Sequence, residues 1–551
     1  MRHLWRCKVL LLAGLAGAVP TLASAQGTAE KGAPALAPAA TPARAPTIGD
    51  TARPPASPAP ADKPAQIGDQ LKVSFNGVFN TWFQRQQNFF LGRADYSDRY
   101  VVQMLRLGLT FGWGDNIRAV TRFDMAQGWW GTDNANYRDE YNANGNASSR
   151  WASKDTKYPL HVDYGYLEFK FPATPLTARM GRMYYGLGNK IILDSNFDGM
   201  QVDAALGSSK LNVGWAKVSE GGVSLNDFEA ANPGSGGIDG RDANLFMASF
   251  AGKAGGGALN YSLYGLYYND GNSVPYLPNR LDYNIHRFAS AVSSANAIGL
   301  SASYDVKSLK LRLDGEGDYL TGKDKLARTN SLANQLLDVN NGDLSGYNLF
   351  ARVTKTLSPK AELAVLVGRG SGDGDVMSGK GNLTKLKTMG FFYLTDVWEQ
   401  SIMPDEEGIT PQGLGAPNIR GYRELENTTI LQANTTLKPT LKFRLHGEYS
   451  IIRATQPIHG WDRTTTNGVI TAANMSALSS QNIGKELAGL VGYAPYNRLD
   501  LVLRGGYLWA GDGARLLING NTTGTAANPW QLKAMVEFRF DNATPARVAS
   551  R

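Results

Sequence analysis

Apolar and polar residues alternate strictly along the stretch 101–130, VVQMLRLGLTFGWGDNIRAVTRFDMAQGWW. Read with a period of two, the first half places Leu107 on an apolar face and Arg106 on a polar face. The second half repeats this after a Gly-Asp-Asn turn, with Phe123 on the apolar face and Arg122 on the polar face. Alternation on both sides of a short turn predicts a β-hairpin with one apolar and one polar face.

The same alternation recurs to the end of the chain and predicts about eighteen strands of roughly ten residues, the length of a tilted membrane strand. They fall at 70–84, 101–113, 117–128, 161–171, 175–185, 197–205, 209–218, 242–253, 257–269, 297–306, 309–321, 343–357, 361–371, 426–437, 440–453, 482–494, 498–510 and 529–540. Turns of two or three residues alternate with long polar loops, such as 129–160 and 372–425. We therefore predict an all-β fold, a single transmembrane antiparallel β-barrel in the bacterial outer membrane, with short periplasmic turns and long extracellular loops.

The first 66 residues differ in composition from the rest. Three basic residues precede the apolar run 9–19, and Ala23-Ser24-Ala25 offers a cleavage site, so we predict a signal peptide over 1–25 rather than an anchor helix. Residues 26–66 are rich in Ala and Pro and predict a disordered periplasmic linker or a tether, ahead of a barrel over 67–551. The only cysteine, Cys7, lies in the predicted signal peptide, which excludes disulfides and thiolate sites from the processed chain.

A barrel of this size leaves an aqueous lumen, and the polar faces of the strands line it. The residues that the strand faces place in the pore are Arg106, Arg118, Arg122, Asp124, Arg312, Asp314, Glu316, Arg444, Glu448, Glu486 and Arg504. Facing charges of both signs suit a path for polar or anionic solutes. The alternative is that these charges only pair across neighbouring strands.

Four segments resemble the alginate-export family of outer-membrane proteins. They are LTARMGRMYYGLGNKIILDSNFDGMQVD (176–203), LVGRGSGDGD (366–375), LKFRLHGEYSIIRA (441–454) and NIGKELAGLVGYAPYNRLDLVLRGGYLWAGDG (482–513). The resemblance implies an eighteen-strand barrel that passively exports an anionic exopolysaccharide through an arginine-lined constriction. The residues that it implies for this role are Arg106, Arg122, Arg179, Arg182, Arg312, Arg444 and Arg504. The predicted lumen contains charges of both signs, so two alternatives to alginate stay open. The protein could export another polysaccharide, or it could be a general or solute-specific porin for small polar solutes.

The sequence gives weaker signals for metal binding, catalysis and nucleic-acid binding. Asp373 and Asp375 could hold a calcium ion, although their spacing does not match a full calcium loop. His446 and Glu448 share a strand face, but no Ser in a nucleophile elbow accompanies them, and we expect no enzyme activity and no cofactor. The formal charge is +8, and the sequence has no basic cluster interleaved with exposed aromatic residues. Nucleic acid is therefore not an expected partner.

The expected partners are outer-membrane lipid, the transported polysaccharide or small polar solute, and, for export, a periplasmic component. We expect a monomer. The loop 372–425 is the only one long enough to suggest that it folds into the pore.

Overall fold

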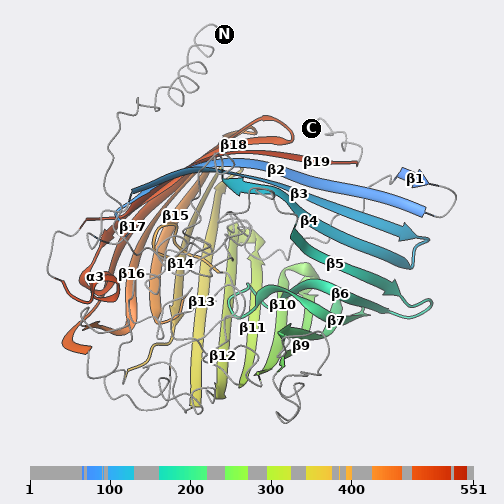
Figure 1. Ribbon diagram of the computed structural model, residues 1–551, viewed down its shortest axis with the longest axis horizontal. Helices are drawn as coiled ribbons and strands as arrows, with labels where there is room; N and C mark the ends of the chain where they lie inside the picture. The colour runs from blue at the N-terminus through green and yellow to red at the C-terminus, as the bar shows by residue number, and fades with distance from the viewer. Residues whose placement is uncertain are drawn as a thin grey trace, which may run out of the picture. The chain divides into compact units, whose positions relative to one another are not determined.

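The computed structural model describes residues 65–67, 71–89, 91, 97–129, 161–219, 242–270, 294–323, 343–374, 384, 392–399, 425–461, 475–522 and 527–542. The predicted signal peptide and almost all of the predicted linker lie outside these residues. The unit that contains the described residues is a single sheet (Figure 1).

Over the described residues the sheet has 19 strands, and all but β1, which begins within the last two residues of the predicted linker, follow the alternating pattern of the sequence. Their bounds are β1 (Ala65–Ile67), β2 (Leu71–Gln87), β3 (Ser97–Trp113), β4 (Ile117–Trp129), β5 (His161–Lys170), β6 (Leu176–Gly186), β7 (Asp194–Leu206), β8 (Ser209–Ser219), β9 (Ala243–Ala254), β10 (Leu259–Asp270), β11 (Ser294–Val306), β12 (Leu311–Lys323), β13 (Asp343–Ser358), β14 (Ala361–Gly370), β15 (Thr428–Thr440), β16 (Phe443–Trp461), β17 (Met475–Tyr496), β18 (Leu499–Ala510) and β19 (Trp530–Asp541). Sequential strands are antiparallel neighbours throughout.

The sheet closes on itself through β19 and β2. Their register runs from Trp530 opposite Gln87 to Asp541 opposite Asn76, and Figure 1 shows the red β19 beside the blue β2. The three-residue β1 pairs only with 71–73 of β2, beyond the part of β2 that β19 contacts. The ring itself therefore contains the 18 strands β2–β19, which confirms the predicted barrel.

Side chains alternate between the two faces of this ring as the hydrophobic pattern predicts. On β13, Leu349 is 57 % exposed on the outer face, while its neighbour Asn348 is buried on the inner face. Lipid offers no hydrogen bonds, so a strand can cross it only in a closed ring whose outer side chains are apolar. The chain is therefore a β-barrel protein of the bacterial outer membrane.

Helical structure is confined to short elements. The helix α3 (Asp512–Asn519) buries Leu516, Leu517 and Ile518 and packs against β16 and β17. The one-turn helices η3 (Gly255–Gly257) and η4 (Lys307–Leu309) form part of two short turns. Over the described residues, no helix has the length and apolar character needed to cross a membrane.

Candidate functional site in the barrel lumen

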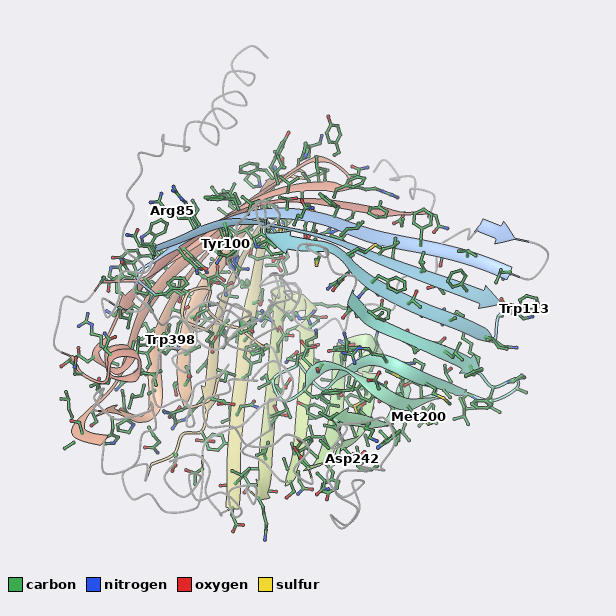
Figure 2. All side chains as sticks on the ribbon, in the orientation of Figure 1. Arg85, Tyr100, Trp113, Met200, Asp242 and Trp398 are labelled. Atoms are coloured by element: carbon green, nitrogen blue, oxygen red, sulfur yellow. The ribbon has the colours of Figure 1, made fainter. Side chains whose placement is uncertain are left out.

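Four arginines on β3–β6 point to the inner face and define what we call the arginine row. They are Arg106, Arg118, Arg122 and Arg179. Each lies on the face opposite to exposed apolar residues of its strand, such as Trp113 on β3, which is labelled at the turn end of that strand in Figure 2. The predicted strand phase is what brings these four side chains to the same wall.

Each arginine of the row pairs with a carboxylate on a neighbouring strand. Nε of Arg106 lies 2.6 Å from Oδ1 of Asp124, and its Nη2 lies 2.9 Å from Oδ2, so the pair is bidentate. Arg118 donates to Glu168 at 3.0 Å through Nε. The carboxylate partners of the other two arginines are Asp163 and Asp203.

Further contacts join two of these pairs and fix a third arginine. Glu168 also faces Arg179, at 3.8 Å, and Asp203 also binds Lys210 at 2.9 Å. The guanidinium of Arg122 lies over the ring of Tyr164, 4.3 Å from its centroid, a distance at which cation–π attraction operates. The arginines are therefore held at fixed positions along the wall.

In each pair the arginine side chain is more exposed to the lumen than the carboxylate. The side chain of Arg118 is 40 % exposed and that of Glu168 is 12 % exposed, while Arg106 is 20 % exposed over a fully buried Asp124. The other two pairs have the same order. The cations thus cover the carboxylates, and the row presents guanidinium groups to the lumen.

A second group of inward polar residues lies on β10, β12 and β13. Asp314 accepts from Arg312 at 2.9 Å and faces Arg352 at 3.6 Å. Higher on β12, Asp318 accepts from the Tyr264 hydroxyl and from Asn348, both at 2.7 Å. Facing charges on this wall do pair across strands, as the alternative interpretation of the sequence expected.

Part of the long loop between β14 and β15 lies inside the barrel. The carboxylate of Glu486, on the inner face of β17, accepts three backbone N–H groups, from Asp396 at 2.6 Å, Val397 at 2.9 Å and Trp398 at 2.9 Å. The side chain of Trp398, labelled in Figure 2, is fully buried. We call residues 392–399 the inward segment.

Contacts with several strands fasten the inward segment to the wall. Arg504 of β18 binds the Asp396 carboxylate, with Nε at 2.6 Å, and Gln531 of β19 donates to the Asp396 carbonyl at 2.6 Å. On β15, Gln432 donates to the carbonyl of Leu394 at 2.6 Å. The ring of Phe392 meets that of Phe350 on β13, with 5.1 Å between centroids.

Glycines on the wall make room for this segment. A Cβ at Gly368 would lie 2.6 Å from Cδ1 of Leu394, and one at Gly506 would lie 2.8 Å from Cγ2 of Val397. Both distances are below normal van der Waals contact. The close approach of the segment therefore depends on the missing side chains.

A shorter segment, between β6 and β7, also turns inward. Leu187, Ile191, Ile192 and Leu193 are buried, and the backbone N–H of Asn189 donates to Glu316 on β12. The shorter segment is thus attached to β12, and the larger one to β13, β15, β17, β18 and β19. Counting around the ring through the β19–β2 pair, β17 is five strands from β4 of the arginine row, so the larger segment enters the lumen from a different wall.

The structure corrects the position of one predicted pore residue. Arg182 pairs in register with Asp198, and its nearest neighbours on the same face are Met180 and Met200, which are exposed on the outer face. Its Nη1 lies 3.3 Å from Oδ2 of Asp198. Arg179 and Arg182 are three positions apart, so in a strand they lie on opposite faces.

The remaining candidates are placed as follows. Arg444, His446 and Glu448 follow one another on the inner face of β16, and His446 contacts the Thr436 hydroxyl at 2.9 Å and Glu448 at 3.4 Å. Asp373 accepts from Thr384 at 3.4 Å, while Asp375 lies outside the described residues. Over the described part of the chain, no group of three or more His, Cys, Asp or Glu residues could hold a metal ion.

Sequence reasoning missed the inward segment residues and the acidic partners of the arginine row. Asp163 sits beside a register shift between β4 and β5, which strict alternation does not reveal. Asp396 and Trp398 lie in a stretch without periodicity. The only available signal was the length of the loop 372–425.

Comparisons with known proteins were made for the whole chain. No family model matches it, and no curated protein does. Solved structures with a similar fold include Pseudomonas aeruginosa OccK2 (OpdF) in complex with glucuronate, with 10 % identity, coverage of 85 % of this chain and 98 % of that chain, and a TM-score of 0.47. OpdK of the same organism with vanillate has 10 % identity, the same coverage and a TM-score of 0.46. At these values we draw no functional conclusion from the likeness.

Proposed function

We propose that the protein is an outer-membrane channel for small anionic solutes. The observation that carries this proposal is the asymmetry of the arginine row, in which each guanidinium covers a more buried carboxylate. A solute in the lumen then meets fixed hydrogen-bond donors that match a carboxylate or phosphate. A hydrated wall of this kind attracts anions without holding them in a deep pocket.

The inward segment supports a small solute over a wide polymer. It takes up lumen space along the wall that contains β17–β19, and three charge-assisted hydrogen bonds to Glu486 hold it there. Constrictions that face fixed charges select by size and by charge. This favours a solute-specific porin over the alginate-like export that the family resemblance implied.

Export of an anionic exopolysaccharide is the second candidate. The observation in its favour is the length of the row, which extends from Arg118, opposite Gly112 near the turn rim, to Arg106, six residues further along β3. At about 3.3 Å per residue, this length exceeds one sugar unit. A polymer would also need the inward segment to move aside.

The test is single-channel current in planar bilayers, in a salt gradient, for the wild-type protein and for Arg118→Ala with Arg122→Ala, two members of the row. We expect anion preference in the wild type and block by a sugar acid such as glucuronate but not by glucose. The double variant should lose both properties. Acidic oligosaccharides of increasing length separate the two candidates, because a polymer channel is blocked more strongly by longer chains.

A matched control removes two arginines from the outer face, Arg369→Ala with Arg453→Ala, and should leave anion preference unchanged. If the wild-type channel shows no anion preference, or the lumen variant keeps it, the arginine row does not determine selectivity and the proposal fails.

A further inference from the structure

Three exposed cations lie close together on the outer face of the barrel, toward the loop ends of their strands. Arg369 on β14 and Arg453 on β16 follow outward apolar residues, and Lys485 on β17, which runs in the opposite direction, precedes the outward Leu487. On β14, for example, Leu363, Val365 and Val367 precede Arg369 on the same face. We call the three cations the outer basic patch.

The strand register brings these residues together. Arg369 and Arg453 are both opposite Thr429 of β15, so they lie two strands, or about 10 Å, apart. Lys485 is opposite Ile451, two residues before Arg453 on β16. The hydroxyl of Thr429, between the two arginines, lies 3.0 Å from that of Thr455.

Acidic side chains do not accompany the patch. Over the described residues of β14–β19, the outward positions contain no Asp or Glu, because the acidic residues of these strands, such as Glu448 and Glu486, face inward. Among the described residues, Arg453 contacts the Gln481 amide at 3.4 Å. The patch therefore presents net positive charge to its surroundings.

Other outward cations at the loop ends differ from the patch. On β6, β8 and β12, three of them have an acidic partner: Arg182 pairs with Asp198 at 3.3 Å, Lys217 with Asp242 at 2.9 Å, and Lys323 with Asp343 at 3.9 Å. Met200 and Asp242 mark the region of β7–β9 in Figure 2. The charges of these three cations are thus neutralised by their partners, whereas no Asp or Glu lies at the described outward positions beside the patch.

The position of the patch relative to the membrane indicates its ligand. Each cation lies where the outward apolar residues end toward the long loops, which is the boundary between acyl chains and head groups of the outer leaflet. Trp509, opposite Lys485, is an aromatic residue of the kind that marks such a boundary. The head groups there are phosphorylated sugars, and arginine pairs and clustered cations next to a membrane span bind phosphate.

We propose that the outer basic patch binds the phosphate groups of the glycolipid in the outer leaflet. The two arginines would hold one phosphate between them, with Thr429 donating a further hydrogen bond, and Lys485 would contact a second. The proposal concerns the outer face and is independent of what the lumen transports.

Binding of bisphosphorylated lipid A in nanodiscs of neutral lipid tests this, with purified wild-type protein and the variant Arg369→Gln, Arg453→Gln, Lys485→Gln. The control variant Arg182→Gln, Lys217→Gln, Lys323→Gln changes the net charge equally, but at outward positions that have acidic partners. At about one kcal/mol per cation, we expect the patch variant to bind about a hundredfold more weakly. The control should stay within about threefold of wild type.

Lipid A without phosphates should bind all three proteins equally weakly. Equal losses in both variants would mean that net charge alone matters, and would overturn the proposal. A second result would also overturn the proposal. If the patch variant changes from oligomer to monomer and its lipid binding is unchanged, the patch is a subunit interface. Heat-modifiable gel migration shows that each variant is folded.

Discussion

At the scale of single residues, the lumen is built from cations that each lie over a more buried acid. Asp124 is fully buried beneath Arg106, so its charge depends on the bidentate pair. A buried pair adds little net stability, but removal of one partner leaves an uncompensated buried charge. Replacing one partner of a pair in the arginine row should therefore lower the stability of the protein more than replacing both partners.

The first prediction follows from this. Arg106→Gln should lower the free energy of unfolding by about 3–5 kcal/mol, because the buried carboxylate of Asp124 loses the bidentate guanidinium. Arg106→Gln with Asp124→Asn should recover most of that loss. Urea unfolding of the detergent-folded barrel measures both, and a double variant as unstable as the single one would contradict the pairing.

Glu486 carries the second prediction. Glu486→Gln replaces a carboxylate that accepts three backbone N–H groups by an amide that accepts fewer and more weakly. Hydrogen bonds to charged groups contribute roughly 1.5–3 kcal/mol each, so the inward segment should detach for part of the time. Single-channel records should then show larger conductance and more current noise. Glu537→Gln, which changes an inward carboxylate on β19 near the turn rim, should leave both unchanged.

For single residues, the period of two in a strand is enough to predict the face on which a side chain lies. The period of two assigns Arg106, Arg118 and Arg122 to the polar face, and in the structure they lie opposite to the exposed apolar residues of their strands. Arg182 was assigned inward because of the family resemblance, against its own strand phase relative to Arg179, and it lies on the outer face. The acidic partners were missed because pairing depends on register, which depends on bulges such as that beside Asp163.

At the scale of elements, the strands were predictable and the inward segment was not. Each of the 18 ring strands overlaps its predicted range, because lipid on one side and water on the other impose alternation on every strand. The segment 392–399 obeys no such constraint. Its position depends on contacts with β13, β15, β17, β18 and β19, which are distant in sequence and leave no periodic signal.

A disulfide tests the position of this segment directly. A Cβ at Gly506 would lie 3.6 Å from Cβ of Asp396, within the range of about 3.5–4.5 Å found in disulfides. Asp396→Cys with Gly506→Cys should therefore cross-link spontaneously in the periplasm, as peptide mass spectrometry would show. The sequence contains one other cysteine, Cys7.

The matched control is Asp396→Cys with Gly447→Cys, since a Cβ at Gly447, on β16, would meet nothing within 4 Å. Cross-linking in the control, or its absence in the first pair, would mean that the segment is not held against β18. Reduction of the disulfide should increase channel noise.

At the scale of the whole molecule, closure depends on a single strand pair. All 12 residues of β19 pair with β2, and without this seam the ring would expose two unpaired edges to lipid. Deletion of 530–551 should therefore prevent refolding in detergent micelles. Deletion of 543–551 should permit it, because every register pair of β19 is retained; heat-modifiable migration distinguishes the two results.

The small strand β1 has a mechanical consequence. Only three residue pairs attach it to β2, at the rim where the barrel begins, whereas β2 is joined along most of its length to both β3 and β19. A pulling force applied to the chain ahead of Ala65 would act first on these three pairs. β1 would peel away at a low load, and the ring would keep its shape while the preceding chain lengthened by a few residues.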